Sequence, residues 1–112
     1  MVARFIRRQF GRYVDRSQGY SLRVTYKNFP GMNIRYAEGT RTMNVFGELM
    51  ANLKELHLDL TTFGRWEAPD DSDVLDEAHR NRVLDRIVAA LGHLGYAARL
   101  WDPATRSWKP RS

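Results

Sequence analysis

Three histidines are the first candidates for chemistry, because histidine is the side chain whose unperturbed pKa lies near neutral pH. His57 and Asp59 are two residues apart in a stretch of alternating leucine and polar residues, which places both on one face of a strand. Such a pair could serve as a general base and the carboxylate that orients it, although a solvated polar face has the same pattern. His79 and His93 are fourteen residues apart, whereas a two-histidine metal site on a helix needs a spacing of about four.

The remaining reactive residues lack the spacing that catalysis requires. The chain has no cysteine, which excludes disulfides, thiolate metal sites and cysteine nucleophiles. Its serines stand in no nucleophile-elbow pattern, and its eight glycines are scattered rather than gathered in a phosphate-binding loop. The six acidic residues of segment 67–77 do not follow the calcium-loop pattern. We therefore predict a non-enzymatic protein that needs no metal and no cofactor.

Charge is distributed unevenly along the chain of 112 residues, whose net charge is +5. Residues 1–41 contain nine basic side chains and two acidic ones, whereas residues 67–77 contain six acids and no base. Fifteen of the 18 basic residues are arginine, which forms forked hydrogen bonds to carboxylates and phosphates. An arginine excess also arises from genomic base composition alone. The polarised charge indicates a surface that meets charged partners.

The elements that must position these groups begin with a basic segment, residues 1–16. Its apolar residues follow helical spacing, and its arginines fall mainly elsewhere around the helix: Val2, Ile6, Phe10 and Tyr13 against Arg4, Arg7, Arg8, Arg12 and Arg16. This spacing predicts a short N-terminal helix over residues 2–16, weakened by Gly11 in its interior. A twisted edge strand is the competing interpretation. A basic amphipathic stretch is also typical of an organelle presequence or a membrane-surface helix.

Apolar residues then recur at every second position, which predicts antiparallel strands joined by short turns. Strands at 22–26 and 34–36 flank a turn at 28–31, and a turn at 38–40 leads to a third strand that ends near Gly47. The next strand, at 56–60, can run on through Phe63 to Trp66 with Gly64 as a bulge. The alternating apolar residues are Leu22, Val24, Tyr26, Ile34, Tyr36, Met43, Val45, Leu56, Leu58 and Leu60.

A helix has the clearest signals in the second half of the chain. Ser72 or Asp73 can cap its start, and an apolar stripe follows at helical spacing: Val83, Leu84, Ile87, Val88, Leu91 and Leu94. A closing strand is predicted at 96–101, and the tail at 104–112 reads as loose.

Together these elements predict an α+β fold, with an antiparallel sheet of four to five strands packing one face on a helix at about 73–91. We expect a single domain over 1–112: a basic segment at 1–16, strands within 20–66, a helix at 73–94, the closing strand and the tail. The longest apolar run, 87–91, is too short for a membrane span, and no secretory signal is recognisable. A cytoplasmic protein without membrane contact is therefore expected.

Nucleic-acid binding is one reading of the basic segment. Its arginines could follow a phosphate backbone, and Phe5, Phe10 and Tyr13 could stack on bases. No helix-turn-helix pair, zinc finger or glycine-aromatic sheet motif accompanies them. Aromatic residues at helical spacing are more often core residues. A small basic nucleic-acid-binding or regulatory domain is the alternative function.

Three short motifs carry a resemblance to known proteins. They are Tyr36-Ala37-Glu38-Gly39-Thr40-Arg41, Trp66-Glu67-Ala68-Pro69 with the acidic residues that follow it, and Tyr96-Ala97-Ala98-Arg99-Leu100-Trp101 after the helix. In this order, between Leu22 and Trp101, the chain resembles small bacterial immunity proteins, the inhibitors encoded beside polymorphic or contact-dependent growth-inhibition toxins. The resemblance implies a protein that binds and neutralises a cognate toxin.

An inhibitor of this kind needs a stable scaffold, a charged patch and a few large anchors. We expect the partner-binding residues at the junction of sheet and helix, where they would enter a basic cleft of the toxin: Arg65, Trp66, Glu67, Asp70, Asp71 and Asp73, with Arg41 from the first motif. A core tryptophan beside helix-capping acids, and Arg41 as a surface turn residue, explain the same pattern. An alternative basic contact, to an acidic partner, is formed by Arg4, Arg7, Arg8 and Arg12.

Overall fold

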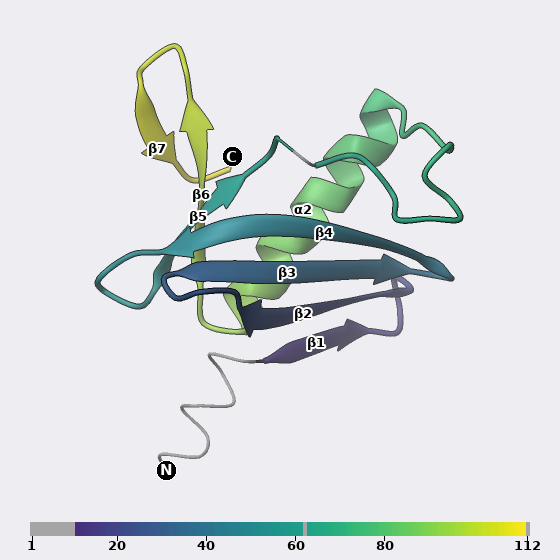
Figure 1. Cartoon of the computed structure of the whole chain (residues 1–112), viewed down its shortest axis with the longest axis horizontal. Helices are drawn as coiled ribbons and strands as arrows, with labels where there is room; N and C mark the ends of the chain where they lie inside the picture. Colours follow the sequence, from purple (N-terminus) through teal and green to yellow (C-terminus); the bar gives the residue numbers. More distant parts are fainter. Residues whose placement is uncertain (1–10, 62, 112) are drawn as a thin grey trace.

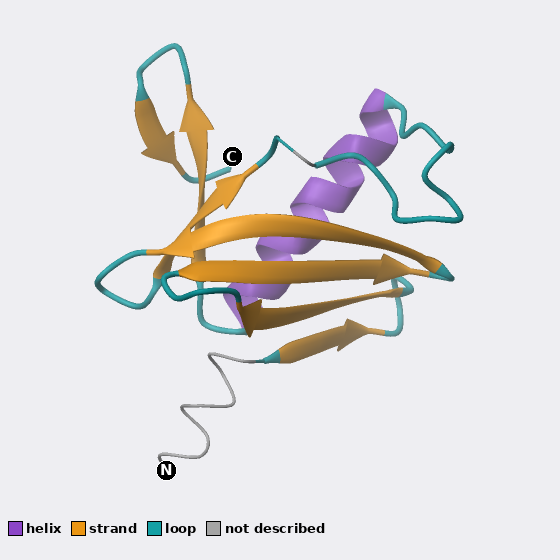
Figure 2. Ribbon diagram, viewed as in Figure 1, coloured by secondary structure: helices purple, strands orange, loops and turns teal. Residues whose placement is uncertain are grey.

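The computed structural model describes residues 11–61 and 63–111 of the chain. These residues form strands β1 to β7 and a helix, α2, which lies between β5 and β6 in the sequence (Figures 1 and 2). The bounds are β1 Arg12–Asp15, β2 Tyr20–Tyr26, β3 Gly31–Glu38, β4 Arg41–Leu49, β5 Glu55–Asp59, α2 Glu77–His93, β6 Ala97–Asp102 and β7 Ser107–Lys109. In the described part of the chain, no helix has both the length and the apolar character that a membrane crossing requires.

The strands stand side by side in the order in which they follow one another in the sequence. Neighbouring strands pair antiparallel from β1 to β5 and again between β6 and β7. The β5–β6 pair is parallel, because α2 carries the chain back across the sheet between them. The meander of successive hairpins is confirmed, and the parallel pair is a feature that the sequence did not predict.

The core lies between one face of the sheet and α2 (Figure 1). Alternation along the strands turns apolar side chains of β2 to β5 toward the helix, and these are almost fully buried: Leu22, Val24, Ile34, Tyr36, Met43, Val45, Leu56 and Leu58. Four residues of the predicted stripe of α2 are buried against them: Val83, Leu84, Ile87 and Leu91. Val88 and Leu94 are only partly buried, and Ala90, which the stripe did not include, is fully buried. Period-two strands and a period-3.6 helix therefore share one apolar interior, as the α+β prediction requires.

The prediction of four to five strands is wrong in number, because two short strands at the ends of the sheet add to it. Residues 12–15, which helical spacing assigned to an N-terminal helix, pair with β2 as β1 instead, so that Arg12 and Val14 face outward. Residues 1–10, with Arg4, Arg7 and Arg8, lie outside the described residues. At the other end, Ser107–Lys109 of the predicted loose tail pair with β6 as β7. Backbone pairing with a neighbouring strand decides the structure at both edges.

The segment between β5 and α2 also differs from prediction. β5 ends at Asp59, and the chain turns away rather than continuing as a strand to Trp66. The helix begins at Glu77, and its N-cap is Asp76 rather than Ser72 or Asp73. The Asp76 carboxylate accepts a hydrogen bond of 2.7 Å from the backbone N–H of His79, which satisfies one of the free donors of the first turn.

Candidate functional site

Apart from Arg41, which begins β4, the predicted partner-binding residues lie on the segment that joins β5 to α2. This segment is fastened to the first half of β4, where the backbone N–H of Glu67 donates to the carbonyl of Thr42 at 2.8 Å. Two consecutive side chains consequently point in opposite directions. Trp66 enters the core and is 2% exposed, and Glu67 lies on the outer face of the sheet. Trp66 packs against the rings of Tyr36 and His79 and is a core residue, unavailable to a partner.

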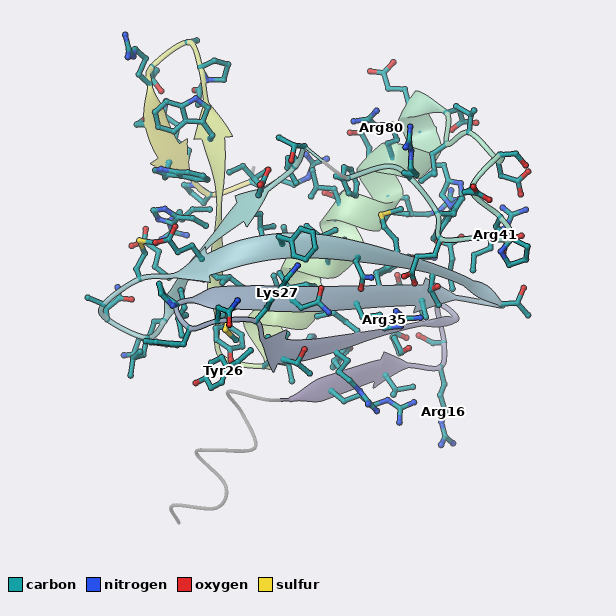
Figure 3. The ribbon with its side chains drawn as sticks, in the orientation of Figure 1. Arg16, Tyr26, Lys27, Arg35, Arg41 and Arg80 are labelled. Atoms are coloured by element: carbon teal, nitrogen blue, oxygen red, sulfur yellow. The ribbon has the colours of Figure 1, made fainter. Side chains whose placement is uncertain are left out.

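Glu67 is committed to contacts within the chain. Its carboxylate forms an ion pair of 2.9 Å with Arg35 and accepts hydrogen bonds from Thr42 Oγ1 at 2.6 Å and Asn44 Nδ2 at 2.9 Å. These partners come from β3 and β4, so the carboxylate holds the segment against the sheet. Figure 3 labels Arg35 on β3. Glu67 is therefore a structural clamp, with about a third of its side chain still exposed.

The other predicted residues lie at the surface between Glu67 and α2, and we call residues 67–76 the acidic link. Asp73 forms an ion pair of 2.7 Å with Arg41, which reaches it from the start of β4 (Figure 3). Asp71 is exposed and Asp70 is half-buried. Arg65 is exposed, and its backbone bridges Val74 across the base of the link. The ion pair thus brings Arg41 to Asp73, and Asp70 and Asp71 precede Asp73 in the same segment.

A polar cluster behind the acidic link was missed by sequence reasoning. The Tyr36 hydroxyl donates to Glu38 Oε1 at 2.7 Å and accepts from Arg86 Nη1 at 3.2 Å, and His79 Nε2 lies 2.8 Å from Glu38 Oε2. Burial raises the pKa of Tyr36, so its hydroxyl stays protonated as a donor. These contacts join β3 to α2 and hold the two elements together, although the buried Nε of Arg86 has no hydrogen-bond partner in the described part of the chain. An acidic residue in phase with the buried residues of β3 was the available signal.

His57 and Asp59 both occupy the outer face of β5, as the alternation predicts. Asp59 accepts a hydrogen bond from the backbone N–H of Thr61 at 3.0 Å, and this bond lowers the pKa of its carboxyl group. The His57 ring stacks on Trp108 of β7, with ring centroids 4.2 Å apart. Asp59 thus stabilises a turn, and His57 packs in an aromatic stack. The two residues therefore do not form a general base with an orienting carboxylate. Within residues 11–61 and 63–111, no three metal-ligating side chains gather closely enough to hold an ion.

That stack forms one wall of an open groove of about 980 Å³. The groove runs between the outer face of β4–β5 and the hairpin of β6 and β7, which projects from the rest of the molecule in Figure 1. Trp101 and Trp108, which are 47% and 38% exposed, face it from the hairpin. Its floor includes Phe46, Glu48, His57 and Asp59, and we call the whole the tryptophan groove.

A row of arginines crosses the outer face at the opposite side of the sheet. Arg12 of β1 lies directly opposite Arg23 of β2, and Arg23 lies opposite Arg35 of β3. All three are exposed, and Arg35 has the Glu67 carboxylate as its counter-ion. Like charges placed opposite each other on neighbouring strands destabilise a sheet. Arg12, one of the residues predicted for an alternative basic contact, is thus one of three exposed arginines on adjacent strands.

Comparison with protein-family models places part of the chain in a known family. A family model described as Immunity protein 74 matches residues 32–97, which is more than half of the chain and runs from β3 to the start of β6. The match includes the acidic link and ends before Trp101 and Trp108. No curated protein and no solved structure matches the chain.

Proposed function

Because the chain belongs to the Immunity protein 74 family, we propose that it binds and neutralises a cognate bacterial toxin without catalysing a reaction. The family match over residues 32–97 is the observation that carries this proposal. The toxin is the product of a neighbouring gene, of the polymorphic or contact-dependent growth-inhibition type. We place the encounter in the cytoplasm, since a chain without cysteine depends on no oxidising compartment.

We further propose that the acidic link is a contact surface. Asp71 and Asp73 are exposed beside the N-terminus of α2, and Asp70 is half-buried between them and Glu67. Arg41 holds Asp73 in place, which fixes where this negative charge stands. A toxin that acts on an anionic substrate presents a basic cleft, and a fixed negative surface fits such a cleft and speeds association. Trp66 and Glu67 support this surface indirectly, because they fasten the link to the sheet.

Co-expression with the neighbouring toxin tests the function. We expect a tagged chain to restore growth of cells that make the toxin, and to retain the toxin as a near-stoichiometric partner after nuclease treatment. A chain that neither restores growth nor retains the toxin would contradict the proposal.

Removal of the negative charges tests the contact surface separately. Replacing Asp70, Asp71 and Asp73 by asparagine should weaken toxin binding at least about tenfold, because rim and steering charges are lost. The matched control adds the same net charge at three exposed positions elsewhere, through Gln18→Lys, Ala89→Lys and Ala104→Lys. Equal affinity of the asparagine variant and the unaltered chain would remove the acidic link from the interface while leaving the function intact.

The arginine row favours a second candidate, nucleic-acid binding. Arg12 and Arg23 present adjacent positive charges on an open sheet face, which is a footprint for phosphates. The two candidates differ in their response to salt. Phosphate binding weakens steeply and log-linearly as the salt concentration rises, whereas a protein interface with a packed centre weakens much less steeply. Nucleic acid that elutes early in a salt gradient, and is abolished by nuclease, would make this candidate the working function.

A further inference from the structure

We propose that the tryptophan groove binds a cationic side chain, preferably arginine, on the surface of the toxin. The inference rests on the proposed function and adds to it a second contact surface with a defined chemistry. The aromatic wall of this groove lies beyond the family match, since Trp101 and Trp108 both come after residue 97, whereas the carboxylates of its floor, Glu48 and Asp59, lie within the match.

The aromatic wall of the groove is exposed and yet held in position. Trp101 and Trp108 meet edge to face, with ring centroids 5.4 Å apart, and Trp108 is stacked on His57 at an interplanar angle of 21°. The stack crosses from the hairpin to β5, so it anchors the hairpin on the sheet. Tryptophan is the residue most enriched among the anchors of protein interfaces, and a side chain that is already ordered loses little entropy on binding.

The floor of the groove supplies negative charge. The hydrogen bond from Thr61 lowers the pKa of Asp59, so this carboxylate is ionised at neutral pH. Glu48 lies on the outer face of β4 opposite His57, and among the described residues it has no hydrogen bond or ion pair from its side chain. Two carboxylates beside indole rings match the guanidinium group, which binds carboxylates through its edge and aromatic rings through its face.

The same pairing already occurs at the border of the groove. The ammonium group of Lys27 lies 4.1 Å from the centroid of the Phe46 ring, which is part of the groove floor. A cation over an aromatic ring is thus stable on this face of the sheet. The carboxylates also disfavour the alternative macromolecule, because they would repel a phosphate backbone. A basic segment of a protein is the occupant that agrees with both the charge and the rings.

Calorimetric titration with the purified product of the neighbouring toxin gene tests this proposal. We expect Trp101→Ala to weaken binding at least about tenfold, as removal of an interface anchor does, and Glu48→Gln to weaken it severalfold without a change of shape. The controls are Val14→Ala, which trims an exposed apolar side chain at the far edge of the sheet, and Glu77→Gln, which removes an exposed carboxylate on α2. Both controls should bind as the unaltered chain does.

Indole resonances give a second readout that is independent of the variants. On complex formation with the same toxin, the side-chain N–H signals of Trp101 and Trp108 should shift, and that of the buried Trp66 should stay in place. If the unaltered chain binds the toxin while Trp101→Ala and Glu48→Gln bind equally well, the groove proposal is overturned and the proposed function stands. If the unaltered chain does not bind the toxin, both are overturned.

Discussion

Trp66 and Trp101 show how differently one residue type is used in this chain. Trp66 is 2% exposed and joins the acidic link to the core, whereas Trp101 is 47% exposed on the hairpin. We expect Trp66→Ala to lower the free energy of unfolding by about 3–5 kcal/mol, because a large buried ring leaves a cavity. Trp101→Ala should lower it by less than about 1 kcal/mol. Urea denaturation measures both, and equal losses for the two variants would contradict these assignments.

Buried tyrosines predict a loss of stability in alkali. Burial raises the pKa of Tyr36 above its ordinary value of 10 and that of Tyr96 to about 12. In the unfolded chain these phenols ionise from pH 10 upward, so the stability they contribute is complete below pH 10 and is lost as pH rises through the folded-state values. We expect the melting temperature, measured by circular dichroism, to fall steadily as the pH rises above 10.

Tyr36→Phe isolates the contribution of one residue. The variant should be less stable than the unaltered chain at neutral pH, because it loses the hydrogen bonds to Glu38 and Arg86. Its stability should decline less steeply in alkali, by up to about 1.4 kcal/mol per pH unit. An unchanged slope would mean that Tyr36 does not set the alkaline limit.

For single residues, the sequence predicts the direction of some side chains on the sheet but not of others. The outer positions of His57 and Asp59 follow from alternation alone. The burial of Trp66 does not, because its phase is set by the hydrogen bond between Glu67 and Thr42, 25 residues away in sequence. The Tyr36–Glu38–His79–Arg86 cluster was missed for the same reason, since its members come from a strand and a helix that meet only in the fold.

The start of α2 offers a direct test at the scale of elements. Asp76 caps the helix by accepting a hydrogen bond from the N–H of His79. Asp76→Ala should cost about 1 kcal/mol, the usual loss for a carboxylate cap. Ser72→Ala, at one of the caps predicted from sequence, should change the free energy of unfolding by less than about 0.5 kcal/mol. A larger effect at Ser72 than at Asp76 would place the helix start where the sequence pattern put it.

For the arginine row we predict a substitution that raises the free energy of unfolding. Arg23→Glu would place a carboxylate between Arg12 and Arg35 and turn two repulsive cross-strand pairs into attractive ones. We expect a gain of about 0.2–1 kcal/mol in low salt, which shrinks as salt is added. Thr25→Glu, on the same face of the same strand but opposite Asn33, should give no such gain. A loss of stability in Arg23→Glu would show that the row is not under electrostatic strain.

The sequence predicted the elements that are long enough to show a regular spacing of apolar residues. The strands from β2 to β5 and the helix α2 each carry enough periodic residues to reveal their type. β1 and β7 have four and three residues, too few for a period to show, and they exist because β2 and β6 offer unpaired backbone groups. The tryptophan groove depends on β7, which explains why the sequence did not reveal it.

At the scale of the whole molecule, charge and aromatic surface are separated on one sheet. The arginine row lies over β1 to β3, and the tryptophan groove lies over β4 to β7. The net charge of +5 consequently says little about any one contact surface. A toxin that contacts both the groove and the acidic link would meet carboxylates in both places, so we expect the contacting surface of the toxin to be basic.

We propose that the chain blocks its toxin by binding it rather than by a reaction. The measurement that tests this most directly is a titration of the purified toxin with the purified chain, in which residual toxin activity is followed as chain is added. An inhibitor that acts by occupancy should abolish the activity at an equimolar end point, and the result should not change with the time of incubation. Inactivation by substoichiometric amounts of chain, growing with time, would contradict the claim and reveal a catalyst.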